Sequence, residues 1–150
     1  MMMSVSLRLS ILPIVFALAL TLPAQPRSPF EGKWVFNAEK SIFSPGPLPK
    51  SETLMFANDT MTVEGVNAQG QPFVFSFTSV PGKAVPVNGG HDLTVEAKES
   101  GNTLVHMWSD HSGTSYGSGE ISTDGKTMRY VLIGNRWGNH VYEVSVFDKQ

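Results

Sequence analysis

The chain has 150 residues, of which 41% are hydrophobic, and its 11 Lys and Arg against 13 Asp and Glu give a formal net charge of −2. This length predicts one domain, and a slightly acidic balance without a basic cluster excludes a nucleic-acid footprint and electrostatic attraction to an anionic membrane. The lack of cysteine excludes disulfides, thiol catalysis and cysteine-ligated metal, so the hydrophobic core must stabilise the fold by itself.

The N-terminus has the pattern of a secretory signal peptide. Arg8 precedes an apolar run over residues 9–22, which is shorter than the roughly 20 residues that a membrane span needs. We expect cleavage after Ala24, so that residues 1–24 are a signal peptide, and an uncleaved anchor is the alternative. The mature protein, residues 25–150, is then expected to be exported, periplasmic or secreted, and not membrane-bound.

The first predicted strand covers residues 33–37, and the triplet Gly32-Lys33-Trp34 marks its start. A large aromatic residue at the start of a barrel can fill its floor, and Trp34 is placed to do so. Residues 37–41 predict one helical turn with Asn37 as the N-terminal cap. The proline-rich run 44–49 cannot form a helix or a central strand, so we expect an extended loop that crosses an end or edge of the sheet.

From residue 52 onward the chain reads as short strands separated by regular turn signals. Asn58-Asp59 and Thr123-Asp124-Gly125 mark tight turns between segments in which apolar and polar residues alternate. The predicted strands cover residues 52–57, 60–66, 72–79, 83–87, 92–99, 103–109, 114–122, 126–133 and 139–147. Short connections favour antiparallel neighbours, and such a meander avoids exposed edges by closing on itself. We therefore predict an all-β, antiparallel up-and-down barrel of about 8–10 strands in a single domain, with a two-sheet sandwich as the alternative.

The aromatic residues that can face one interior are the best functional lead. A barrel of this size can hold a small ligand, but the same side chains can also simply fill a core. Core filling is favoured for Trp34 and Phe75, whereas both roles stay open for residues with polar tips, which need a partner when buried. The predicted ligand-binding residues are Phe73, Phe75, Phe77, Trp108, Tyr130, His140 and Tyr142.

Gly32-Lys33-Trp34 resembles the glycine-x-tryptophan opening of the lipocalin and calycin barrels. This resemblance implies that Trp34 lies at the closed end of the barrel and that an arginine from a late strand covers it. Arg129 is the candidate for that role, and Arg136 is the second choice.

A longer pattern resembles a group of small, exported, lipocalin-like bacterial proteins of unsettled function, found in soil bacteria of the acidobacterial kind. It comprises GKWVFNAEKSIFSPGPLPKSETL, NAQGQP, DGKTM and the closing VYEVSVFDKQ, and it spans nearly the whole mature chain. The resemblance implies a lipocalin-like fold and export, and it carries over no catalytic residue. The stretch 106–111 and the loop at Arg136-Trp137 depart from the pattern of the group, so no ligand carries over to them.

Two kinds of reactive site have some support in the sequence. His106 and His111 flank Asp110 and could ligate zinc or copper, but five residues of separation along a strand would point the histidines to opposite faces. A Ser–His–acid site using Ser118 and His140 lacks the strand-to-helix turn of a nucleophile elbow. We therefore predict no metal site, no cofactor and no catalytic residue.

The composition, pattern and resemblance together predict an exported, non-catalytic barrel that binds a small, largely apolar molecule. The first alternative is a solid barrel that acts as an envelope interaction protein through the Trp108 and Trp137 loops and the proline loop. A metal-assisted hydrolase built on the histidines is the second. We expect no nucleic-acid partner, and a protein partner is not identified by the sequence.

Overall fold

The computed structural model describes residues 27–136 and 138–150. The predicted signal peptide, residues 1–24, and Trp137 lie outside the described residues. The described chain forms β1 (Gly32–Phe36), η1 (Ala38–Lys40), β2 (Ile42–Ser44), β3 (Ser51–Ala57), β4 (Thr60–Val66), β5 (Pro72–Thr78), β6 (Val85–Pro86), β7 (Thr94–Ser100), β8 (Thr103–Asp110), β9 (Gly113–Ile121), β10 (Thr127–Arg136) and β11 (Asn139–Lys149). Across these two ranges, no helix has the length and apolar character needed to span a membrane.

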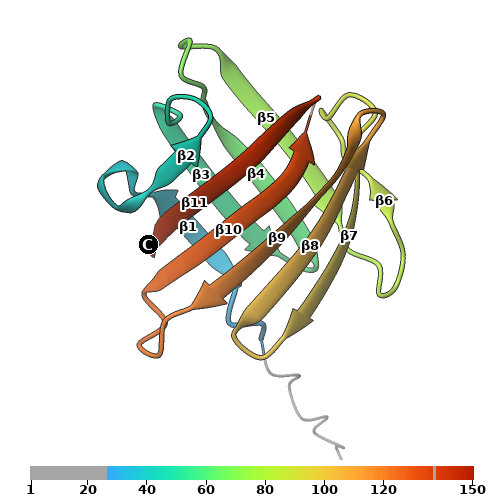
Figure 1. Ribbon diagram of the computed structural model, residues 1–150. Coiled ribbons are helices and arrows are strands. Elements are labelled where there is room, and N and C mark those ends of the chain that lie inside the picture. The colour runs from blue at the N-terminus through green and yellow to red at the C-terminus, as the bar shows by residue number, and fades with distance from the viewer. Residues whose placement is uncertain (1–26, 137) are drawn as a thin grey trace, which may run out of the picture.

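The strands form one antiparallel sheet that curls into a nearly closed barrel (Figure 1). Its order is β5-β4-β3-β1-β11-β10-β9-β8-β7-β6, and β2 pairs with β11 outside this path. The two edge strands of this sheet, β5 and β6, come together where Ser76 of β5 and Asn88, just after β6, exchange two backbone hydrogen bonds with N–O distances of 3.0 and 2.8 Å. The predicted all-β up-and-down barrel is confirmed, and the two-sheet sandwich is wrong.

One stretch differs from the expectation because turn-type residues lie within a strand. Gly134 and Asn135 read as loop residues, yet β10 continues through Arg136, which pairs with Asn139. Gly134 has a φ of 137°, and a Cβ there would lie 2.6 Å from Ser115 Cα, so only glycine fits this close approach of β9 and β10. The result matters for function because it places Arg136 at the end of a strand instead of in a loose loop.

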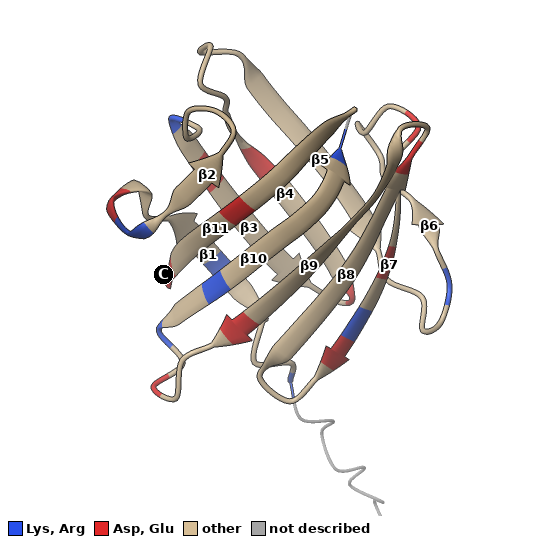
Figure 2. Ribbon diagram, in the orientation of Figure 1, with Lys and Arg blue, Asp and Glu red and all other residues tan. Residues whose placement is uncertain are grey.

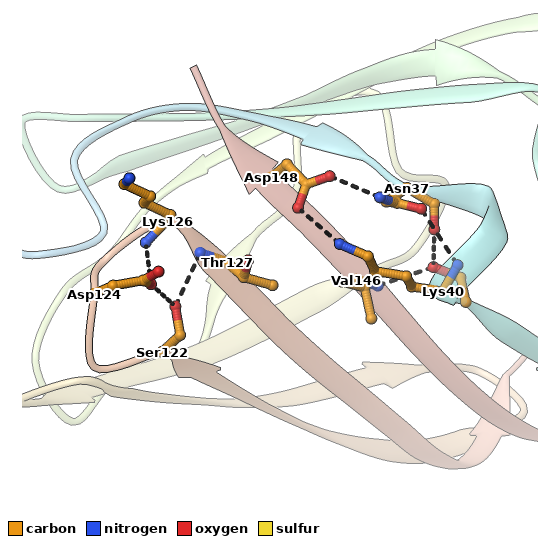
Figure 3. A network of polar contacts seen from close by, with 9 residues as sticks. Asn37, Lys40, Ser122, Asp124, Lys126, Thr127, Val146 and Asp148 are labelled. Carbon is orange, nitrogen blue, oxygen red and sulfur yellow. Dashed lines mark hydrogen bonds and ion pairs between the residues drawn. The ribbon is translucent and has the colours of Figure 1, made fainter.

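The short helix η1 is fixed to β11 by side-chain contacts (Figure 3). Asn37 caps the helix as predicted, since its Oδ1 accepts from the Lys40 amide at 3.3 Å. The Asn37 Nδ2 donates to Asp148 Oδ2 at 2.7 Å, and Lys40 Nζ lies 3.6 Å from the other oxygen of Asp148. The Val146 amide donates to Ser41 Oγ at 2.9 Å, so both the helix and its exit are held on the outer side of β11.

Trp34 is part of the hydrophobic core, and its role as the floor of the barrel stays a prediction. Its side chain is 0% exposed, and its Nε1 donates to the Phe30 carbonyl at 2.7 Å. The cation above the indole is Lys149, whose Nζ lies 4.8 Å from the ring centroid and also donates to the Pro29 carbonyl at 2.9 Å. The expected cover by Arg129 is wrong, because Arg129 pairs with Val146 on β11 and its side chain is exposed.

The charged residues are distributed over strands and loops without a cluster of basic side chains in the view of Figure 2. Acidic and basic residues occur both along the strands, as on β7 and β11, and in the turns between them. The arrangement agrees with the absence of a basic footprint in the sequence.

Candidate ligand-binding site

The barrel contains a cavity of about 620 Å³. Three segments border it at one end, residues 45–49, 67–69 and 89–91, and we call them the mouth loops. The volume lies within the range of about 300–1,000 Å³ that is usual for small-molecule sites. The apolar wall consists of Leu54, Phe56, Met61, Val63, Phe73, Phe75, Leu93, Leu104, Trp108, Met128, Leu132 and Phe147.

Four of the seven predicted ligand-binding residues line this cavity, namely Phe73, Phe75, Trp108 and Tyr130. Phe77 also faces the interior, but it is packed in the core and does not line the cavity, and its ring centroid lies 5.5 Å from that of Trp108. The alternation along β5 therefore correctly predicted that the three phenylalanine side chains share the inner face. Whether these residues contact a ligand stays a prediction.

The interior placement of His140 and Tyr142 is wrong. Tyr142 is 45% exposed on the outer face, where it pairs with Ile133 of β10, and His140 is exposed as well. The inward positions of β11 are the alternate ones, including Glu143 and Ser145, which line the cavity. Tyrosine on a strand suits either face, so residue type alone did not identify the inner one.

Tyr130 is the centre of a hydrogen-bonded group deep in the cavity. Its hydroxyl accepts from Trp108 Nε1 at 2.9 Å and lies 3.0 Å from His106 Nδ1. Burial raises the pKa of the Tyr130 hydroxyl, and the hydrogen bond from Trp108 opposes that rise. The phenol therefore stays neutral and can act as both a donor and an acceptor.

Two glycines of β9 make room for Tyr130. Gly119 is paired with Tyr130, and Gly117 is two residues away on the same inner face. A Cβ at Gly117 would lie 1.8 Å from the Tyr130 hydroxyl oxygen, so any side chain there would displace the phenol. The glycine-rich stretch that gave no chemical signal in the sequence thus has a packing role next to the candidate site.

The substitution Gly117→Ala is expected to lower the free energy of unfolding by about 1–3 kcal/mol, because the added methyl overpacks the wall. It is also expected to shift the tryptophan fluorescence, since Trp108 Nε1 loses its acceptor when the phenol moves. Ser118→Ala is the matched control, because Ser118 is the next residue and its side chain is exposed on the outer face. Equal unfolding midpoints and equal spectra for the two variants would contradict the packing role.

His106 is buried inside the barrel and is neutral. Its side chain is 1% exposed, and burial lowers the pKa of the imidazole to about 3. Its Nδ1 contacts the Tyr130 hydroxyl, but its Nε2 is buried without a hydrogen-bond partner among the described residues. Since His106 lines the cavity, this nitrogen is a polar position that a bound molecule can satisfy.

Three charged residues on the wall were not predicted as site residues. Glu52 from β3, Arg136 from β10 and Glu143 from β11 all line the cavity. The pKa of Glu52 is raised to about 7, mainly because the carboxyl group is buried and also because Glu143 is near, while Arg136 lowers it. Burial likewise raises the pKa of Glu143, and Arg136 opposes the shift. The three groups therefore share one electrostatic environment.

The reactive sites weighed from the sequence are not assembled. No three His, Cys, Asp or Glu side chains within residues 27–136 and 138–150 are grouped to hold a metal ion. His106 is inside the barrel while His111 is exposed, and Asp110 Oδ1 accepts from the amides of Ser112 and Gly113 in its own turn. Ser118 and His140 are both exposed, but Ser118 pairs with Val131 and His140 pairs with Asn135, four residues farther along β10 and on its other side, so the two are not brought together.

Comparison with known proteins supports the antiparallel barrel fold. No protein-family model matches the sequence, and no curated protein sequence matches it. The solved structure of the fluorescent protein UnaG is similar, with a TM-score of 0.53, 17% sequence identity, and coverage of 81% of this chain and 97% of that one. A fatty acid transporter, REP1-NXSQ, gives a TM-score of 0.51 at 14% identity and covers 80% of this chain and 95% of that one.

A third similar structure is a Schistosoma mansoni fatty acid binding protein in complex with arachidonic acid. Its TM-score is 0.51 at 15% identity, and the match covers 82% of this chain and 97% of that one. Two of the three proteins are thus described as carrying or binding fatty acids, and none of the three is described as an enzyme. At these identities the likeness establishes the shared barrel architecture.

Proposed function

We propose that the protein is an exported, non-catalytic barrel that binds a small, largely apolar molecule in its interior. The observation that carries this proposal is the cavity of about 620 Å³, which has aromatic and aliphatic walls and a few inward polar groups. Burial of apolar ligand surface would drive binding at roughly 25 cal/mol per Å². The fatty acid ligands named for two similar barrels support this class of molecule.

The cavity counts against the alternative of a solid barrel that works only through its surface. That alternative used the Trp108 and Trp137 loops, but Trp108 is buried within the barrel and Trp137 lies outside the described residues. Trp108 is instead positioned to report binding, because its indole lines the cavity and its fluorescence responds to a molecule placed against it.

Native mass spectrometry of the protein purified from the producing cell tests the proposal. We expect a co-purified molecule or added mass upon incubation with a long-chain alcohol, which offers an apolar body and a neutral polar end. The same spectrum tests export, because the expected mass is that of residues 25–150. A protein that keeps residues 1–24 would contradict the proposed export. A protein that takes up no apolar molecule would contradict the proposed binding.

A larger side chain inside the cavity is expected to weaken ligand binding. Leu54 is buried on β3 and lines the cavity, so Leu54→Trp should lower the affinity for a long-chain alcohol at least about tenfold by occupying the lumen. Met55→Trp is the matched control, because Met55 is the next residue and is 41% exposed on the outer face. Isothermal titration gives both affinities, and thermal unfolding checks that both variants are folded. Unchanged binding by a folded Leu54→Trp variant would place the ligand elsewhere.

A further inference from the structure

The charge on the cavity wall is unbalanced toward the negative. Among the described residues that line the cavity, Glu52 and Glu143 carry carboxyl groups and Arg136 carries the guanidinium group. Arg136 acts on both carboxyl groups, and when both are ionised it can offset one negative charge but not two. An anionic ligand would add a third negative group to this buried set, whereas a cationic ligand would compensate it.

The apolar part of the wall also suits a cation. Phe73 and Phe75 lie with ring centroids 6.2 Å apart, and Trp108 meets the Phe75 ring edge-on at 6.2 Å. All three line the same cavity as the carboxyl groups. Aromatic faces attract an ammonium group within about 6 Å, most strongly in a desolvated site.

A second and independent sign of a polar ligand is the buried nitrogen of His106. Its Nε2 has no partner among the described residues although its side chain is 1% exposed. In either neutral tautomer this atom is left unsatisfied, because Nδ1 alone contacts Tyr130. A buried polar atom of this kind is costly unless a bound molecule or water reaches it.

We propose that the cavity selects an amphiphile whose polar end is a protonated amine, and that Glu52 and Glu143 make it discriminate against a fatty acid. This inference rests on the proposed function and names its ligand class. The aliphatic body of the ligand occupies the apolar wall, and the ammonium group lies among the two carboxyl groups and the aromatic rings. The selectivity differs from the ligands named for the similar barrels, and it comes from side chains of this chain alone.

The arrangement makes amine binding dependent on pH. Glu52 exchanges its proton near neutral pH, and the groups that face it across the cavity are Glu143 of β11, Arg136 and Tyr130 of β10, and His106 of β8. An alkylamine stays protonated over this range, so its affinity rises with pH as Glu52 loses its proton. His91, in a mouth loop, is the other histidine that borders the cavity, and His91→Asn separates its contribution.

The experiment compares dodecylamine, dodecanol and dodecanoate by isothermal titration of the mature protein, below their aggregation concentrations. At about pH 8 we expect the amine to bind at least about tenfold more tightly than the carboxylate, with the alcohol between them. Between about pH 8 and pH 6 the amine affinity should fall by about fivefold to tenfold. Equal or tighter binding of dodecanoate overturns the inference but leaves the proposed function standing. Binding of none of the three overturns the proposed function and the inference with it.

Variants assign the selectivity to the carboxyl group. Glu52→Gln should lower the ratio of amine to carboxylate affinity about tenfold and flatten its pH dependence, because the side chain keeps its shape but loses its charge. Glu64→Gln is the matched control, since Glu64 lies on the neighbouring strand β4 and is exposed on the outer face. A ratio that is the same in Glu52→Gln and Glu64→Gln would overturn the role of Glu52 in selection.

Discussion

Replacing Trp34 with alanine is expected to lower the free energy of unfolding by about 3–5 kcal/mol, the range for removing a buried aromatic side chain. Trp34 is 0% exposed, and its Nε1 donates to the Phe30 carbonyl at 2.7 Å. The substitution therefore opens a void in the core and also leaves a buried carbonyl without its donor. Urea unfolding measures the effect as a lower midpoint with an unchanged slope.

Two further variants separate the parts of this expectation. Trp34→Phe keeps much of the apolar surface and loses the Nε1 hydrogen bond, so it should cost less than Trp34→Ala. Arg129→Ala should stay within about 0.5 kcal/mol of the wild type, because Arg129 is exposed, whereas Lys149→Ala removes the cation over the indole. A larger loss for Arg129→Ala than for Lys149→Ala would restore Arg129 as the cover and contradict the structure.

The barrel was predictable because most of its strands and turns have clear signals in the local sequence. Tight turns such as Asn58-Asp59, where both residues have positive φ, interrupt segments with a strict alternation of apolar and polar side chains. β4 coincides with its predicted range, 60–66. β2 was missed because Ile42–Ser44 is too short to show alternation and is defined only by its pairing with β11. Long-range pairing of that kind leaves no local pattern in a single sequence.

The site was only partly predictable because the aromatic residues show the clearest pattern in the sequence and the charged residues of the wall do not. Glu52 shares its strand face with Leu54 and Phe56, so the same alternation that predicts β3 places its carboxyl group inside the barrel. That signal was present in the sequence, and a charged residue in phase with core residues marks a functional position. Strand alternation could not place Arg136 at the cavity, because its position depends on where the β10–β11 hairpin turns.

The buried carboxyl group of Glu52 is expected to reduce stability at alkaline pH, and Glu52→Gln should restore it. The pKa of Glu52 is raised from 4.5 to about 7, mainly by burial, so the folded protein holds a proton that the unfolded chain has released between these values. Folding stability therefore falls as pH rises from 4.5 to about 7, and the full cost is present above that range. Removing the charge should raise the free energy of unfolding at about pH 8 by up to about 3 kcal/mol.

The gain should shrink as pH falls and approach zero below pH 4.5, where the carboxyl group is protonated in both states. His106 has the opposite linkage, because burial lowers its pKa from 6.5 to about 3, so its contribution to stability is lost as pH falls through that interval. The two slopes oppose each other in the wild type, and Glu52→Gln should expose the His106 slope by itself. Urea unfolding at several pH values measures this, with Glu64→Gln as the control. If the increase in the free energy of unfolding of Glu52→Gln is independent of pH, Glu52 is not a buried ionising group. If the variant is more stable but has lost its selectivity for the amine, the wild-type cavity keeps a destabilising charge for ligand recognition.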